Sequence, residues 1–442
     1  MTSYWCELAW LGGEAAESGV LVQVDGERIA SVEAGVVAPA EATRLDGLTL
    51  PGLANAHSHA FQRALRGRAQ RAGGSFWTWR EDMYAVAARI DPQNYFRLAR
   101  ATFAEMALAG ITAVGEFHYL HHAPGGAPYA DPNEIGAAMI AAASEAGIRI
   151  TLLDACYLHG GIDEPLNEVQ RRFADADADA WAARASALSA TDGARIGAAI
   201  HSVRAVDPAS AASVAAWASE HRCPLHAHVS EQPAENVACL DAYGETPVAV
   251  LERAGALAAN FTAVHATPLT GADIAALGGS GGRCCLCPTT ERDLADGIGP
   301  ARELADAGAS LALGSDSHAV IDQFEEARAL ELDERLATGE RGRHGAAALL
   351  RAATAGGHAA LGWGDAGAIE PGAHADLVTV GLDGVRLAGT TAETAPEAAV
   401  FAASAADIER VICGGREIVR DGAHADLDVV AELRGSIAEV LP

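Results

Sequence analysis

The feature that most constrains this chain is an alternation of short apolar runs with alanine-rich helical stretches, which begins near residue 50. Segments such as "PNEIGAAMIAAASEAG" and "PASAASVAAWASEH" repeat apolar residues at three and four positions and open on helix-starting residues. Repeated strand–helix units build a parallel sheet. Eight units predict an α/β fold, a (β/α)8 TIM-like barrel of roughly 250 residues or more. The predicted strands are 50–57, 111–117, 149–155, 195–201, 224–228, 261–265, 283–287 and 310–316.

The two ends of the chain differ from this middle part. Residues 1–48 contain "VLVQVDGERIASVEAG", which reads as two short strands around an Asp-Gly turn. Residues 367–442 contain similar strand-and-turn segments, such as "IERVICGGREIV". We therefore predict one small β-sandwich domain built from both termini, 1–48 and 367–442. It stands beside a barrel domain over 49–366 that carries the active site.

Composition limits the partners of this protein. A net charge of -28 argues against a nucleic-acid or anionic-membrane surface, because both need clustered cations. All 31 basic residues are arginine, so neither a lysine Schiff base nor a carbamylated-lysine metal bridge can form. The first residues lack a signal-peptide pattern, and no apolar run approaches the ~18 residues of a membrane span. We therefore expect a cytoplasmic protein.

Histidines and one aspartate stand where predicted barrel strands end. His57 and His59 close the first strand, and an i, i+2 pair points both side chains to one face. His228 closes the fifth strand, His265 the sixth and Asp316 the eighth. In such a barrel the reacting groups lie at the carboxyl ends of the strands. A lone histidine in an apolar run is usually a core residue, but matching ends on several strands favour a shared site.

These residue types predict a metal centre. Neutral imidazoles with one carboxylate suit zinc or iron(II) and leave a position for water. Zinc lowers the pKa of its water to roughly 7, which supplies hydroxide at neutral pH. Glu231, three residues beyond His228 in "HVSE", can bring a carboxylate to that water and move protons. We therefore predict hydrolysis at a polarised carbon, with one metal ion because no lysine is present to bridge two.

Other clusters favour structure over chemistry. The cysteines of "CCLC" (284–287) lack a second paired motif, so an interior strand is a better interpretation than a structural zinc site. The histidines of "GEFHYLHH" (115–122) are expected to support the pocket without binding the metal. Trp77 and Trp79 are expected either to wall the pocket or to pack under a loop.

The chain resembles the amidohydrolase superfamily along nearly its whole length, in the motifs "PGLANAHSHAF", "HVSE", "AVHAT", "LALGSDSH" and "GAIEPGAHADLV". The resemblance is to the single-metal deaminase branch. It implies a barrel fold and one zinc ion, with iron(II) as the alternative metal. It also implies the metal ligands, which are His57, His59, His228 and Asp316.

A more specific group of motifs resembles the formimidoylglutamate deiminase family: "SFWTWRE" (75–81), "GEFHYLHH", "HSVRAV" (201–206) and "CPTTERDLADGIGP" (287–300). Members hydrolyse N-formimino-L-glutamate to N-formyl-L-glutamate and ammonia in histidine degradation. The resemblance implies that Asp316 accepts a proton from the attacking water, that Glu231 protonates the imino nitrogen and that His265 polarises the reacting centre. It assigns substrate binding to Gln62, Arg80, Tyr119, His201 and Arg204. Two arginines suit a dicarboxylate, because guanidinium groups bind carboxylates bidentately.

Alternatives to this interpretation stay open. A deaminase of a purine or another amino-substituted heterocycle would share the metal ligands, but it needs stacking surfaces and neutral amide contacts, whereas Arg80 and Arg204 predict an acidic substrate. Either arginine could instead form an ordinary surface ion pair. A non-catalytic barrel would be expected to have lost ligands, yet all are present. The resemblance further implies a homodimer and a small dicarboxylate as partner.

Overall fold

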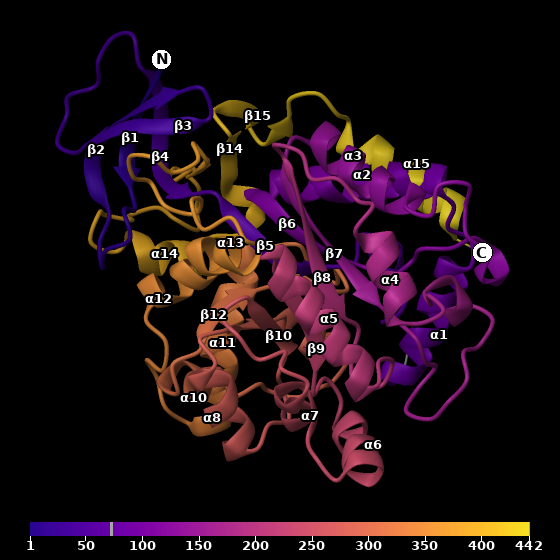
Figure 1. Cartoon of the computed structure of the whole chain (residues 1–442). Coiled ribbons are helices and arrows are strands. Elements are labelled where there is room, and N and C mark those ends of the chain that lie inside the picture. Colours follow the sequence, from indigo (N-terminus) through magenta and orange to yellow (C-terminus); the bar gives the residue numbers. More distant parts are fainter. Residues whose placement is uncertain (71–73, 442) are drawn as a thin grey trace.

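The computed structural model describes residues 1–70 and 74–441, which form two eight-stranded sheets. One sheet is a barrel of parallel strands in sequence order, surrounded by helices (Figure 1). Its first and last strands are linked through Asp316, whose amide donates to His57 O at 3.0 Å and whose carbonyl accepts from His59 N at 3.3 Å. The predicted barrel is confirmed. Its strands are β5 (Leu53–Ser58), β6 (Ile111–His118), β7 (Arg149–Cys156), β8 (Ala194–Ile200), β9 (Leu225–Val229), β10 (Phe261–His265), β11 (Arg283–Leu286) and β12 (Ser310–Leu313).

Several helices around the barrel begin at residues that cap them. Asp91, Asp207 and Asp322 each accept hydrogen bonds from two amides in the first turn of the helix that follows. None of the helices in the described part of the chain has the length and hydrophobicity of a membrane span. The helices are α1 (Phe76–Ala87), α2 (Pro92–Leu108), α3 (Glu134–Ala146), α4 (Ala178–Ala185), α5 (Pro208–His221), α6 (Pro233–Tyr243), α7 (Pro247–Arg253), α8 (Gly271–Gly279), α9 (Pro288–Asp293), α10 (Ala301–Asp306), α11 (Gln323–Thr338), α12 (Ala346–Arg351), α13 (Gly357–Ala360), α14 (Ala395–Phe401) and α15 (Val429–Val440).

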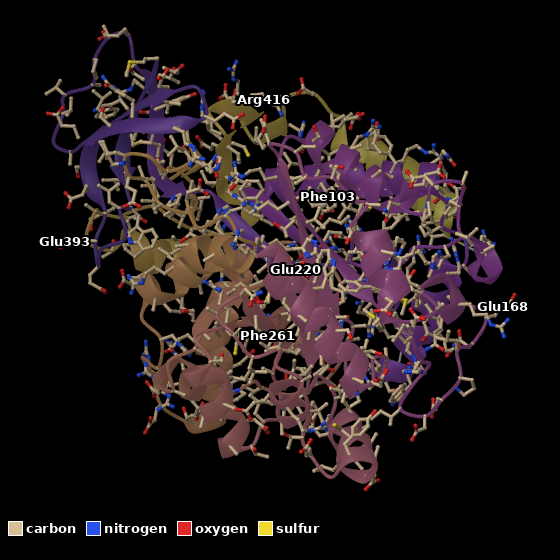
Figure 2. The ribbon with its side chains drawn as sticks, in the orientation of Figure 1. Phe103, Glu168, Glu220, Phe261, Glu393 and Arg416 are labelled. Carbon is tan, nitrogen blue, oxygen red and sulfur yellow. The ribbon has the colours of Figure 1, made fainter. Side chains whose placement is uncertain are left out.

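The barrel strands are buried on both faces because helices cover the outside and side chains fill the inside. Every residue of β6, β7, β9 and β10 is buried. Figure 2 shows side chains filling the interior; Phe103 and Phe261 are fully buried, whereas Glu168, Glu220, Glu393 and Arg416 are exposed. Burial on both faces explains why these strands appear in the sequence as continuous apolar runs.

The first predicted strand, 50–57, is wrong as one element. The chain instead leaves the second sheet at Pro51, the last residue of β4, and enters the barrel at Leu53. Gly52 makes this crossing possible, because a Cβ atom at this position would collide with Thr112 and Asp376. The apolar run is continuous because both sheets bury it, so hydrophobicity alone does not reveal the division.

The second sheet unites both ends of the chain, as predicted. Its two halves join where β4 pairs antiparallel with β13, in a register that sets Leu50 opposite Val378. The predicted Asp-Gly turn lies between β2 and β3. The domain limits at 48/49 and 366/367 stay predictions. The strands of this sheet are β1 (Thr2–Ala9), β2 (Glu17–Asp25), β3 (Arg28–Glu33), β4 (Thr43–Pro51), β13 (Leu377–Val380), β14 (Ile408–Cys413), β15 (Arg416–Arg420) and β16 (Ala423–His424).

A buried ion pair connects the two sheets. Arg149, at the start of β7, binds both carboxylate oxygens of Asp376, which lies just before β13. The same carboxylate accepts the amide of Gly414 at 2.8 Å. Both side chains are almost wholly removed from solvent. The pair therefore holds the terminal sheet against the end of the barrel opposite the carboxyl ends of the strands.

Candidate active site

Four of the predicted site residues converge at the carboxyl end of the barrel. The distance from His57 Nε2 is 3.2 Å both to His228 Nε2 and to Asp316 Oδ1. His59 Nε2 lies 3.4 Å from the same two atoms. Four ligands bound tetrahedrally at about 2.0–2.1 Å from one zinc ion are separated by about 3.3–3.4 Å. These four separations therefore fall in the range expected for ligands of one tetrahedral metal ion.

Backbone carbonyl groups set the orientation of two of these imidazoles. His59 Nδ1 lies 2.9 Å from Phe117 O, and His228 Nδ1 lies 2.8 Å from His201 O. A carbonyl oxygen only accepts hydrogen bonds, so each Nδ1 carries the proton and donates. The Nε2 lone pair of each ring is then free for a metal ion, which is the usual arrangement of metal-binding histidines.

Burial determines the charge of this cluster. It lowers the pKa of His57 to about 3, and it lowers the pKa of both His59 and His228 below the ordinary value. Burial raises the pKa of Asp316. A hydrogen bond from His57 and the nearby histidines outweigh this effect and hold the pKa of this carboxyl well below its usual range. Three neutral imidazoles and one carboxylate form a donor set that suits zinc.

His265 differs from the other three histidines. Its ligand atom lies within 4.8 Å of those of His57, His228 and Asp316, so it also belongs to the group that can hold a metal ion. Its Nε2 is 3.9 Å from Glu231 Oε1 and 4.0 Å from Asp316 Oδ2. Burial lowers the pKa of His265, but the negative charges around it outweigh this effect and raise the pKa to about 10. His265 Nε2 therefore lies between these two carboxylates without a hydrogen-bond partner among the described residues, where it can donate to a bound molecule.

The loops that carry these side chains are held by buried polar contacts. Glu116 accepts hydrogen bonds from Ser58 Oγ and from the amide of Ala60, both at 2.7 Å, and so braces the segment around His59. Asn55 accepts from the amide of Ser315 at 2.9 Å, next to Asp316. Burial raises the pKa of Glu116 to about 8, although its hydrogen bonds oppose the rise. Glu116 lies in the quoted "GEFHYLHH" but was not identified from the sequence.

Backbone strain is concentrated at the same place. Non-glycine residues with positive φ cost of order 1–3 kcal/mol each and persist where the surrounding structure enforces them. Such residues lie at the end of, or directly after, three of the strands that supply the cluster. They are Ser230 (φ 51°), His265 (φ 68°), Ala266 (φ 51°) and Asp316 (φ 39°). The fold therefore accepts strain to direct these side chains into the barrel mouth.

A cavity of about 320 Å³ opens beside the cluster. Its lining includes His59, His228, Glu231 and Asp316 together with all of the residues predicted to bind substrate, which are Gln62, Arg80, Tyr119, His201 and Arg204. Gln62 Nε2 donates to Tyr119 Oη at 3.2 Å. The structure thus brings every predicted substrate residue next to the candidate metal ligands.

The two arginines of the cavity are held differently. The guanidinium of Arg80 lies over the Trp77 ring, 4.4 Å from its centroid, and no carboxylate in the described part of the chain lies within 4 Å of it. Arg204 lies over Phe76 at 5.7 Å and pairs with Glu231, Nη2 to Oε2, at 3.1 Å. Neither arginine is part of the surface ion pair considered from the sequence.

Several cavity residues were not identified from the sequence. Phe76 stands beside Trp77 in the quoted "SFWTWRE" and lines the cavity, as do Trp77 and Trp79, which the sequence had offered as pocket walls. Tyr157 also lines it, from the segment directly after β7. Glu235 also lines the cavity, from the first turn of α6, four residues beyond Glu231.

Two clusters singled out in the sequence lie elsewhere. His121 makes its recorded hydrogen bond away from the cavity, between its Nε2 and Ala155 O at 3.0 Å. Asp154, which lies beside His121, is bound by Arg184. The histidines of "GEFHYLHH" are thus buried outside the cavity lining. The cysteines of "CCLC" are buried and unpaired, two of them within β11, as the interior-strand interpretation predicted.

Comparisons with known proteins agree with this geometry. The model of the Amidohydrolase family matches residues 48–418. The chain is 40% identical over 398 residues to formimidoylglutamate deiminase of Pseudomonas aeruginosa, covering 87% of each chain. It is also 32% identical over 434 residues to 8-oxoguanine deaminase of the same organism, covering 94% of this chain and 92% of that one. Among solved structures, an amidohydrolase from Brucella melitensis superposes with a TM-score of 0.93 and 33% identity, and the match covers both chains completely.

Proposed function

The chain belongs to the amidohydrolase family, and we propose that within it the protein hydrolyses N-formimino-L-glutamate to N-formyl-L-glutamate and ammonia. The family assignment, with its deiminase relative, makes the protein a hydrolase of C–N bonds. The observation that carries the finer proposal is the presence of Arg80 and Arg204 in the cavity that adjoins the histidine–aspartate cluster. A substrate with two carboxylates and a reacting amidine matches both features.

One zinc ion is the proposed cofactor, with His57, His59, His228 and Asp316 as its ligands. The donor set and the 3.2–3.4 Å spacing of the ligand atoms support this choice. A bound zinc ion would lower the pKa of a water molecule to roughly 7 and polarise the substrate. Iron(II) accepts the same ligands, so the metal itself has to be measured.

The remaining steps are assigned to side chains of the protein. Asp316 accepts a proton as water adds to the formimino carbon, and His265, beside Asp316, donates a hydrogen bond to the oxygen that adds. Glu231, on the other side of His265, gives a proton to the nitrogen that leaves as ammonia. The proton held by Asp316 then passes to the same nitrogen, the bond between this nitrogen and the formimino carbon breaks, and the hydroxyl proton returns to Glu231 as the carbon keeps the oxygen as a formyl group. Water supplies all the atoms that the products require.

Recognition of the substrate is assigned to the polar residues of the cavity. Arg80 is available for a carboxylate because no acidic side chain in the described part of the chain pairs with it. Arg204 keeps donors beyond those directed at its acidic neighbours, since a guanidinium carries five N–H groups. Gln62, Tyr119 and His201 lie close to one another and add neutral contacts. Arg80 thus presents positive charge where a diacid would bind, although the protein as a whole is negatively charged.

A purine or other heterocycle deaminase is the second candidate. The observation in its favour is aromatic: Phe76, Trp77, Tyr84, Tyr119 and Tyr157 all line the cavity. However, Trp77 and Phe76 lie against the two arginines, which reduces the surface available for stacking. The two candidates differ in the charge of the substrate, and that difference can be measured.

The test is steady-state ammonia release by the zinc-loaded protein. We expect turnover of N-formimino-L-glutamate well above that of neutral amidines and of aminopurines. The variants R80Q and R204Q should raise KM for the diacid, whereas R253Q, at an exposed ion pair outside the cavity, should leave it unchanged. Turnover of an aminopurine but not of the diacid would replace the proposal with the second candidate. The homodimer stays a prediction, which light scattering tests.

A further inference from the structure

Glu235 is a buried carboxylate that the proposed chemistry does not use. It lies in the first turn of α6, lines the cavity and is only 2% exposed. Its Oε1 accepts the amide of Ser230 at 3.0 Å. Its Oε2 lies 3.0 Å from Arg204 Nε. One side chain therefore contacts two loops that follow different barrel strands, β8 and β9.

The contact with Ser230 supports the residue proposed to donate the proton. Ser230 has φ 51° and directly precedes Glu231, so the direction of the Glu231 side chain depends on this strained backbone. A non-glycine residue holds such a conformation only when its surroundings enforce it. The hydrogen bond to Glu235 is a contact that does so.

The contact with Arg204 places the same carboxylate at the proposed substrate site. Arg204 lies between Glu235 and Glu231, and the paired Nη2–Oε2 atoms of Arg204 and Glu231 are 3.1 Å apart. The Arg204 side chain is 17% exposed, so it has little freedom to move into solvent. Arg204 Nε lies within ion-pair distance of Glu235 Oε2 but makes no hydrogen bond to it, so the attraction between the two charges holds the planar guanidinium beside Glu235.

We propose that Glu235 is a positioning residue that holds Arg204 for recognition of a substrate carboxylate and holds the backbone turn that carries Glu231. The inference rests on the proposed function for the identity of the substrate. It predicts that recognition of a diacid and delivery of the proton are coupled through one side chain. Glu235 itself is not expected to touch the substrate.

The test combines binding and turnover in zinc-loaded protein. The variants are E235Q, R204Q and the double variant, with E245Q as the control because Glu245 forms an exposed ion pair with Arg253. Calorimetry measures the affinity for glutarate, a diacid that lacks the reacting group. We expect E235Q to weaken glutarate binding about 10- to 100-fold, and to have little further effect in the R204Q background. Equal effects of E235Q in both backgrounds would overturn the inference.

Turnover provides the readout that a purely structural role would not change. N-formiminoglycine and 4-formiminobutyrate each lack one of the two carboxylates of N-formimino-L-glutamate, so both are compared with it. E235Q should reduce kcat/KM for N-formimino-L-glutamate more than for the analogue that lacks the carboxylate bound by Arg204. An equal loss on all three substrates would contradict a role through Arg204. If E235Q does not fold, E235D keeps the charge but shortens the side chain, and wild-type glutarate affinity in E235D would also contradict the inference.

The two proposals fail in different ways. A wild-type protein that binds glutarate but does not turn over any formimino acid would refute the proposed function. The calorimetry of glutarate binding to E235Q would then test the role of Glu235 by itself. A wild-type protein that does not bind glutarate would overturn the inference, because Arg204 would then not recognise carboxylates.

Discussion

Replacing Glu231 with glutamine separates proton transfer from metal binding. Glu231 Oε2 lies 3.1 Å from Arg204, and its Oε1 lies 3.9 Å from His265. Glu231 is not among the side chains whose donor atoms form the candidate metal group. Glutamine has the same shape and still accepts a hydrogen bond from Arg204, but it has no acidic proton to give. We therefore expect E231Q to keep its metal and lose most of its activity.

The size of the loss follows from the step that is removed. A positioned acid or base contributes about 10²- to 10⁴-fold to a rate, and at about 1.36 kcal/mol per tenfold this raises the barrier by about 2.7–5.4 kcal/mol. The cost in folding stability should be smaller, about 1 kcal/mol, because a neutral hydrogen bond replaces a charged one and Arg204 keeps Glu235 as a partner.

The assay measures kcat by ammonia release, the zinc content by mass spectrometry and the melting temperature of the same samples. The control is E245Q, which changes an exposed glutamate and should leave all three unchanged. A kcat for E231Q within tenfold of the wild type would show that the proton comes from another group. Loss of zinc from E231Q would show that this carboxylate belongs to the metal site.

Three further predictions concern the metal and the fold. H228A should lower the zinc content itself, and full occupancy measured by mass spectrometry would argue against the four-ligand scheme. D376N should lower the free energy of unfolding by about 3–5 kcal/mol in urea titrations, because it leaves Arg149 buried without its anion; a loss below 1 kcal/mol would refute this. Burial raises the pKa of Asp376, but Arg149 outweighs this effect and holds the pKa low. The stabilisation by the ion pair is therefore present above about pH 4 and is lost as the pH falls. The pH dependence of the free energy of unfolding should be weaker in D376N. G52A should melt at a lower temperature than the wild type, because its Cβ meets Thr112 and Asp376; an unchanged melting temperature would contradict the crowding at this crossing.

Much of the fold and part of the site could be predicted from local sequence. Strands such as β10 (Phe261–His265) are buried on both faces, so they appear as unbroken apolar runs between helical periods. His57 and His59 stand out because an i, i+2 pair at a strand end points one way. The apolar pattern did not reveal the division of the first predicted strand at Gly52. The residues on both sides of Gly52 are equally buried, although they belong to different sheets.

The sequence by itself determined the order of strands and helices, and it determined which side chains stand at the strand ends. Only the tertiary structure decided the 3.2 Å separations of His57 from His228 and from Asp316, and the position of Glu235 between Arg204 and Ser230. The reason is physical. Hydrophobic periodicity depends on neighbours a few residues apart, whereas a metal centre or a buried ion pair depends on distances between residues far apart in the chain, which barrel closure and packing set together.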